Sequence, residues 1–207
     1  MKKILLFSAA TALFHFSAQA TVTINLGAGK LFESDGTTPV PNGALIQLIV
    51  STGDAIFTAP TPTSFTGGSS DDVVVASFMM NSFGGGPGIF TQVVNFAYSG
   101  SLAPGEQMML RWWPLISGTS ATSPGTGASY GQFRTDNVEN SSNIAWITPS
   151  DGSNVNLFFL TGTIGGVEPN SAGVANLTVV PEPSPFACVG AGLAALVVWQ
   201  RVRRRRG

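Results

Sequence analysis

The chain has very few of the side chains that carry most protein chemistry. Its 207 residues include one cysteine and one histidine, and charged residues make up 10% of it, against roughly 25% in a typical soluble domain. A single cysteine excludes an intramolecular disulfide. His15 and Cys188 lie near the two ends, so the stretch from Thr21 to Val180 has neither imidazole nor thiol. Zinc binding and His- or Cys-based catalysis are therefore not expected there.

Positive charge is equally scarce in the middle of the chain. Seven of the ten basic residues lie at the two ends, two next to Met1 and five after Gln200. Between Thr21 and Val180, three basic residues stand against ten acidic ones, which gives this body a net charge of −7. Such a surface cannot neutralise a row of phosphates, so the composition excludes a nucleic-acid binder.

The first residues have the three-part pattern of an export signal. Two lysines precede an apolar core from Ile4 to Leu13, which is too short to span a bilayer and has no amphipathic stripe. Ala18 and Ala20 then offer small residues at the two positions that a signal peptidase reads. We therefore expect a signal helix over residues 1–20, cleaved by signal peptidase so that the mature chain begins at Thr21.

The last residues also contain three parts in order. A proline-rich stretch is followed by 14 apolar residues from Phe186 to Trp199 and then by an arginine cluster. A helix of that length spans about 21 Å, less than the ~30 Å hydrocarbon core, but snorkelling arginines extend its reach. We expect a short transmembrane helix over 186–199, with a stop-transfer end formed by Trp199, Arg201, Arg203, Arg204, Arg205 and Arg206.

The proline-rich stretch contains the tripeptide Pro181-Glu182-Pro183. With the apolar helix and the arginine cluster after it, it resembles the PEP-CTERM sorting signal of exported bacterial proteins, over residues 180–207. The resemblance implies that Pro181, Glu182 and Pro183 are a substrate motif for an exosortase-type sorting enzyme. It also implies a transient anchor in the inner membrane of a Gram-negative, exopolysaccharide-producing bacterium, and delivery to the cell surface or extracellular matrix. The positive-inside rule agrees, since it places the arginines in the cytoplasm and the body outside.

The body between the two signals, residues 21–179, is predicted to be all-β. Apolar, β-branched runs alternate with Gly-, Pro-, Ser- and Asn-rich turns, and no long stretch has a helical stripe. The expected fold is a single antiparallel β-sandwich, Ig-like or jelly-roll-like. Strands are predicted near residues 21–26, 30–33, 44–51, 72–80, 90–99, 107–113, 130–135, 144–148, 155–162 and 175–180.

Alternation predicts which side chains share a face of a strand. In the strand at 107–113 we expect Met108, Leu110 and Trp112 in the core, and Met109, Arg111 and Trp113 on the opposite face. The strand beginning at Val155 is apolar on both faces toward its end, so it is expected to be central and covered.

Two tryptophans are the candidate ligand-binding residues. Trp113 lies on the opposite face from Trp112, and a flat aromatic exposed to solvent can stack on a sugar. Trp113 and Trp146 are therefore candidates for stacking on an exopolysaccharide. The alternative is that both pack inside the protein, as tryptophans usually do.

Acidic residues offer two further alternatives. The pairs Glu33/Asp35, Asp71/Asp72 and Asp136/Glu139 have the oxygen ligands that calcium prefers. The last two pairs are also candidates for the two facing carboxylates that a glycoside hydrolase uses. All three pairs lie next to turn residues, where acids usually form local hydrogen bonds. A serine–lysine pair would have to use Lys30, which has no serine motif around it. We therefore assign no catalytic residue, no metal and no cofactor.

The preferred hypothesis is an exported surface or extracellular-matrix protein with a non-enzymatic, structural or adhesive body. A carbohydrate-binding module for exopolysaccharide and a carboxylate-based glycoside hydrolase are the alternatives. Exposure of Trp113 or Trp146 to solvent would favour the carbohydrate-binding module. Burial of Trp112, Trp113 and Trp146 would exclude a module that binds sugars through these tryptophans.

Overall fold

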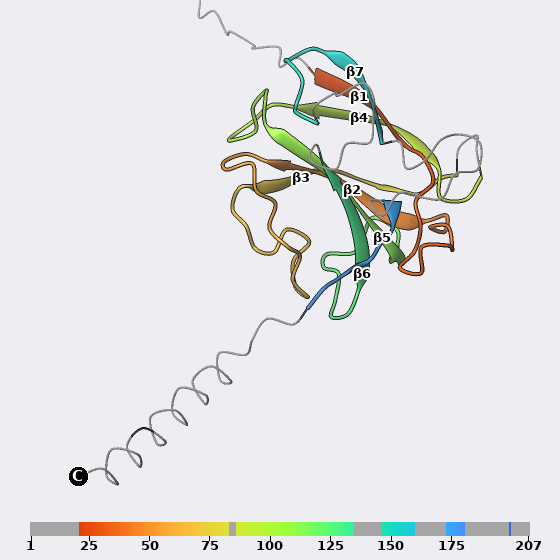
Figure 1. The fold of residues 1–207 in the computed structure, drawn as a ribbon. Coiled ribbons are helices and arrows are strands. Elements are labelled where there is room, and N and C mark those ends of the chain that lie inside the picture. The colour runs from red at the N-terminus through yellow and green to blue at the C-terminus, as the bar shows by residue number, and fades with distance from the viewer. Residues whose placement is uncertain (1–20, 83–85, 135–145, 160–172, 181–198, 200–207) are drawn as a thin grey trace, which may run out of the picture.

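Eight β-strands in two sheets make up the described body of the protein (Figure 1). The computed structural model describes residues 21–82, 86–134, 146–159, 173–180 and 199. The strands are β1 (Thr21–Ala28), β2 (Ala44–Ser51), β3 (Asp72–Met79), β4 (Phe90–Ala97), β5 (Gln107–Ser117), β6 (Ser129–Arg134), β7 (Asn154–Phe159) and β8 (Leu177–Thr178). The described part of residues 21–180 contains no α-helix, so the predicted all-β class is confirmed.

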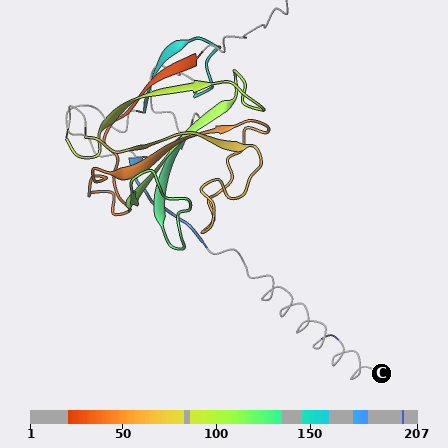
Figure 2. The same cartoon turned by 180° about the vertical axis from the view of Figure 1, so that it is seen from behind.

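The two sheets lie one over the other in a sandwich-like arrangement (Figures 1 and 2). The smaller sheet has the strand order β4-β1-β7, and the larger has the order β3-β2-β5-β6-β8. One large hydrophobic cluster takes residues from both sheets, among them Ile24 of β1, Val94 of β4, Leu48 of β2 and Leu110 of β5. The main core therefore lies between the sheets.

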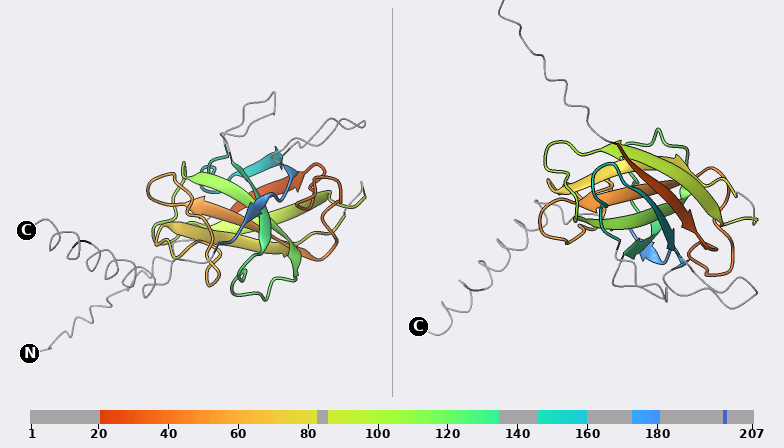
Figure 3. Two further views of the ribbon diagram at one scale, coloured as in Figure 1. Left: turned by 60° about the horizontal axis from the view of Figure 1, so that its bottom comes forward. Right: turned by 90° about the horizontal axis from the view of Figure 1, so that it is seen from above.

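Strand β1 shows how the sequence produces the smaller sheet. Val22, Ile24 and Leu26 are buried, while the alternate Thr23 and Asn25 are only partly buried. Because successive side chains point to opposite faces of a strand, this alternation turns one face toward the core and leaves the other polar. The right panel of Figure 3 looks down on that outer, polar face.

The larger sheet is covered on both faces at its centre. All eight residues of β2 are buried, and so is the run from Met108 to Trp113 in β5. A second hydrophobic cluster accounts for the outer face: Leu45, Phe65, Trp113, Tyr130 and Val179. Phe65 comes from the long β2–β3 connection, so loops form an additional layer over this sheet. Met108, Leu110 and Trp112 lie in the main core as predicted, but the opposite face of β5 is buried too.

The expectation of a wholly antiparallel sandwich is wrong at one pair of strands. β1 pairs with β7 in parallel, with Thr23 opposite Asn154 and Ala28 opposite Phe159. Alternation cannot reveal strand direction, because a strand has the same period in both kinds of pairing. The connection between β1 and β7 contains most of the body, which is long enough for the crossover that parallel strands require.

Three predicted strands are shorter in the structure, and a fourth is placed differently. In the stretch 30–33, Phe32 forms single bridges to Pro39 and Val174, and proline has no N–H with which to extend a ladder. The described part of 144–148 forms one bridge, and the stretch 175–180 is reduced to β8. The strand at 155–162, seen here as β7, is the terminal strand of its described sheet, with Asn154 and Asn156 exposed; it is not central.

Candidate functional site

The tryptophans proposed to stack on a sugar are both inside the protein. Trp113 has 0% of its surface exposed and Trp146 has 3%, and Trp112 is also at 0%. Trp146 packs edge-on against Phe133 in the main core, with ring centroids 5.0 Å apart. The predicted carbohydrate-stacking role is therefore wrong for Trp113 and Trp146, because neither ring reaches solvent.

Trp113 is buried because loops close over the outer face of the larger sheet. The Phe65 ring packs edge-on against the Trp113 ring, with ring centroids 5.1 Å apart. The ring of Tyr130, on the neighbouring strand β6, has its centroid 5.0 Å from that of Trp113. The indole nitrogen donates a hydrogen bond of 2.9 Å to Oε1 of the buried Gln47. Alternation predicts the correct face of β5 for Trp113, but no feature of the sequence marks a loop layer above that face.

Next to Trp113, Arg111 is the most deeply buried charged residue of the described body, with 1% of its surface exposed. Its guanidinium donates hydrogen bonds to the carbonyls of Phe65 and Thr58, both in the β2–β3 connection, and to Oε1 of Gln132. It also lies 5.3 Å from the centre of the Tyr130 ring. Arg111 therefore fastens the covering loop to the sheet.

Burial changes the electrostatics of this cluster without making Arg111 a base. Burial lowers the pKa of the Arg111 guanidinium from its usual range to about 10, so the group stays charged at neutral pH. Burial also raises the pKa of the nearby Asp72 carboxyl, although the Thr58 N–H donates to Oδ2 at 2.7 Å and works against that rise. Asp72 Oδ1 makes no hydrogen bond within the described chain. The hydrogen bonds of Arg111 make this cluster a clamp between the covering loop and the sheet.

Asp35 and Asp71, one from each of the two described acidic pairs, accept hydrogen bonds within local turns. Asp35 accepts hydrogen bonds from the backbone of Thr37 and Thr38 and from the Thr38 hydroxyl, and these bonds hold its pKa well below the usual range. Asp71 accepts a short hydrogen bond from Ser69, which lowers its pKa. Among the described residues, no group of three His, Cys, Asp or Glu side chains is placed to hold a metal. Asp136 and Glu139 lie outside the described residues.

Lys30, the lysine considered for a serine–lysine pair, lies at the surface after β1. Its Nζ is 5.5 Å from the centre of the Phe32 ring, close enough for a cation–π contact.

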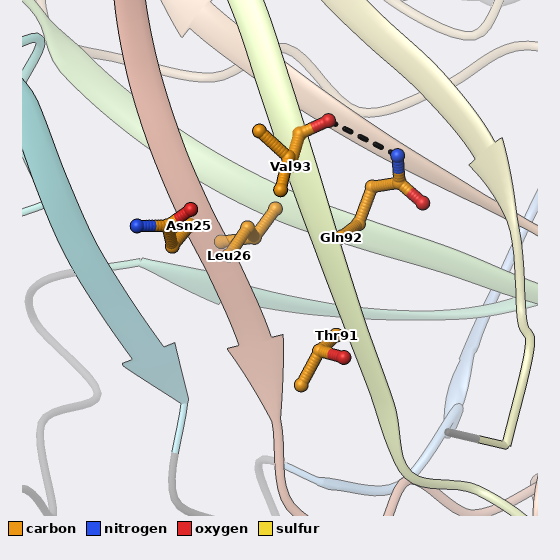
Figure 4. Close-up of a pocket in the computed structure, with 5 residues that line it drawn as sticks. All are labelled: Asn25, Leu26, Thr91, Gln92 and Val93. Atoms are coloured by element: carbon orange, nitrogen blue, oxygen red, sulfur yellow. Dashed lines mark hydrogen bonds between the residues drawn. The ribbon is translucent and has the colours of Figure 1, made fainter. Parts of the chain in front are cut away.

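A shallow pocket of about 190 Å³ lies over strands β1 and β4 (Figure 4). Asn25, Leu26, Thr91, Gln92 and Val93 line it. Asn25 donates to the side chains of Asn154 and Asn156, and Thr23 donates to Asn95, so amides and hydroxyls link the three strands across this face. The pocket can offer hydrogen bonds to an uncharged polar group, and none of its lining residues is charged. Sequence reasoning overlooked it, although the alternation in β1 marks the face.

The expected terminal sites lie almost wholly outside the described residues. Thr21, the expected mature N-terminus, is the exposed first residue of β1, and Trp199 is 57% exposed. The other predicted positions fall outside the described ranges: Ala18, Ala20, Pro181, Glu182, Pro183, Arg201, Arg203, Arg204, Arg205 and Arg206. Within the described residues, no helix has the length and apolar character needed to cross a membrane.

No family model, curated protein or solved structure matches this chain.

Proposed function

We propose that the chain is an exported bacterial protein of the cell surface or extracellular matrix, sorted by an exosortase-type enzyme, with a structural or adhesive body that is not an enzyme. The observation that carries the proposal is the order of features at the C-terminus. Pro181-Glu182-Pro183, an apolar stretch and five arginines follow one another at the end of a chain that begins with an export signal.

The limits of the folded body support this proposal. Thr21, the residue after the expected signal cleavage, is exposed and begins β1. Val180, the residue before the Pro-Glu-Pro motif, is 69% exposed and follows β8. Cleavage after Ala20 and near Pro183 would therefore remove both signals and leave every described strand in place.

The use of side chains in the body supports a scaffold role. Its large aromatic residues pack in two clusters, one between the sheets and one beneath the loops. Asp35 and Asp71 accept hydrogen bonds within turns, and Arg111 donates a hydrogen bond to the β2–β3 connection. These are contacts that stabilise a fold which must persist outside the cell.

Localisation in two matched bacterial strains tests the proposal, one with an exosortase-type enzyme and one without it. The full chain is compared with a variant in which Pro181, Glu182 and Pro183 are all changed to alanine. Pro185→Ala is the matched control, because it changes a proline outside the tripeptide. We expect the full chain and the control to leave the membrane fraction only in the strain with the enzyme, and the triple variant to stay in the membrane. Equal distribution of the full chain in both strains would contradict sorting by such an enzyme.

A further inference from the structure

Strand β3 ends the larger sheet, and within the described chain only a β-bulge and Asp72 at its start protect its edge. Among the described strands it pairs with β2 alone, in antiparallel register. After Asp72 its sequence is Val-Val-Val-Ala-Ser-Phe-Met, with no charged residue and no proline. Natural edge strands are commonly blunted by lysine, by proline or by a covering segment, because their outer N–H and C=O groups can pair with another chain.

The terminal strand β4 of the smaller sheet is protected, and the contrast is informative. The side-chain amide of Asn81 donates to the carbonyl of Thr91 at 3.0 Å, and that of Gln92 donates to the carbonyl of Val93 at 3.0 Å. Figure 4 shows the Val93 carbonyl pointing away from β1, toward the outer side of the sheet. Side chains thus occupy two acceptors that a further strand would need on β4.

No such capping is found on β3. Within the described chain, the backbone of Val73–Met79 makes no hydrogen bond outside its ladder with β2. A β-bulge at Val75 interrupts that ladder, but Ala76–Met79 continue in unbroken register with β2. Within the described chain, the outer N–H and C=O groups of this segment therefore have no backbone partner.

The side chains of β3 also favour an added strand. Val74 and Met79 are 36% and 50% exposed on the outer face, so a neighbouring strand would bury apolar surface there. Val75 and Ala76 are partly buried and pack against the main core, so a strand beside them would extend the core layer as well. Main-chain hydrogen bonds and apolar contact would therefore act together, as they do in β-strand addition.

We propose that β3 pairs with β3 of a second copy of this chain, in antiparallel orientation, which joins two five-stranded sheets into one continuous sheet. A two-fold axis makes such an interface self-complementary, because the same edge serves both partners. It also places the two Asp72 carboxylates at opposite ends of the shared strands, so the only charged residue of β3 does not face its own copy. The proposal rests on the fold and does not depend on export or sorting.

Cross-linking of the purified full chain tests this pairing. In a Cys188→Ser background, Ser77→Cys places one thiol on an exposed position of β3, and Thr91→Cys places one on an exposed position of β4. With a bis-maleimide reagent, the β3 thiol is expected to give covalent dimers and the β4 thiol is not. Absence of dimer from the β3 thiol, or equal yields from both thiols, would overturn the proposal.

A charge placed on the edge provides the second arm of the experiment. Val74→Lys, added to the Ser77→Cys chain, places a charge on the apolar surface that the partner strand would bury and is expected to reduce the dimer yield about tenfold. Val93→Lys is the matched control on β4, where Val93 is 53% exposed, and it is expected to leave the yield unchanged. Val74→Thr, which adds no charge, keeps the dimer and shows that position 74 tolerates substitution. An unchanged yield with Val74→Lys would contradict pairing through β3.

Discussion

Trp113 on β5 donates its indole hydrogen to Gln47 on the neighbouring strand β2, and both side chains are buried beneath loops of the body. The contact explains how a polar atom of tryptophan and a side-chain amide are accommodated away from water. It also means that the outer face of the larger sheet is internal where Trp113 lies, so the Trp113 ring cannot stack on a ligand at the surface.

Replacing the acceptor tests this contact. Gln47→Leu leaves the Trp113 N–H buried without a partner and is expected to lower the free energy of unfolding by ~1–3 kcal/mol. In a Trp113→Phe background, which has no N–H to satisfy, the same change is expected to cost clearly less. Urea unfolding of the four proteins of this double-mutant cycle measures the coupling, and equal costs in both backgrounds would refute it.

The guanidinium of Arg111 is expected to hold the β2–β3 connection in place. Arg111→Met removes its hydrogen bonds to Thr58 and Phe65 and is expected to cost about 3 kcal/mol of stability. Limited proteolysis should then cut within residues 52–71 much faster than in the parent protein. Lys30→Met, an exposed cation replaced in the same way, is the control and should change neither result. If Arg111→Met gave the cleavage pattern of the parent, the clamp would be disproved.

Gly131 on β6 lies against the indole of Trp112 on β5. A Cβ atom added at position 131 would lie 2.0 Å from Cζ2 of Trp112, far inside contact distance. Gly131→Ala is therefore expected to destabilise the protein by ~1–3 kcal/mol through overpacking. Combining it with Trp112→Phe, which removes the clashing atoms, should cost less than the two single changes added together. Thermal unfolding measures the three variants, and strict additivity would contradict the contact.

Asp35 should make the protein sensitive to acid. Hydrogen bonds from Thr38 and Thr37 lower the pKa of this carboxyl in the folded state below its unfolded value of 3.8. The stabilisation is therefore fully present above the unfolded pKa and is lost as the pH falls below it. Asp35→Asn keeps an oxygen acceptor in the turn but cannot titrate. Its melting temperature should fall less between pH 5 and pH 2 than that of the parent, and parallel pH profiles would count against this role.

The sequence predicts the class of fold and the main core because both depend on local periodicity. The alternation of Val22, Ile24 and Leu26 with polar residues marks β1, and Met108, Leu110 and Trp112 lie in the core as alternation predicts. Strand direction is not encoded in that period, so the parallel pairing of β1 with β7 could not be foreseen.

The candidate site was harder to predict for a different physical reason. Exposure of Trp113 depends on where Phe65 lies, and Phe65 belongs to an irregular loop with no periodicity to place it. A buried arginine is similarly hard to predict, because its partners are backbone carbonyls that carry no sequence signature. The signals expected at the two ends of the chain are inferred from residue type and order alone, and the proposed function depends on them.

Mass spectrometry of the termini of the protein recovered from the cell surface tests the central claim most directly. The proposed export and sorting predict a chain that begins at Thr21, ends near Pro183 and lacks Phe186–Gly207. An intact chain that still begins at Met1, or one released to the surface with its arginine tail attached, would contradict it.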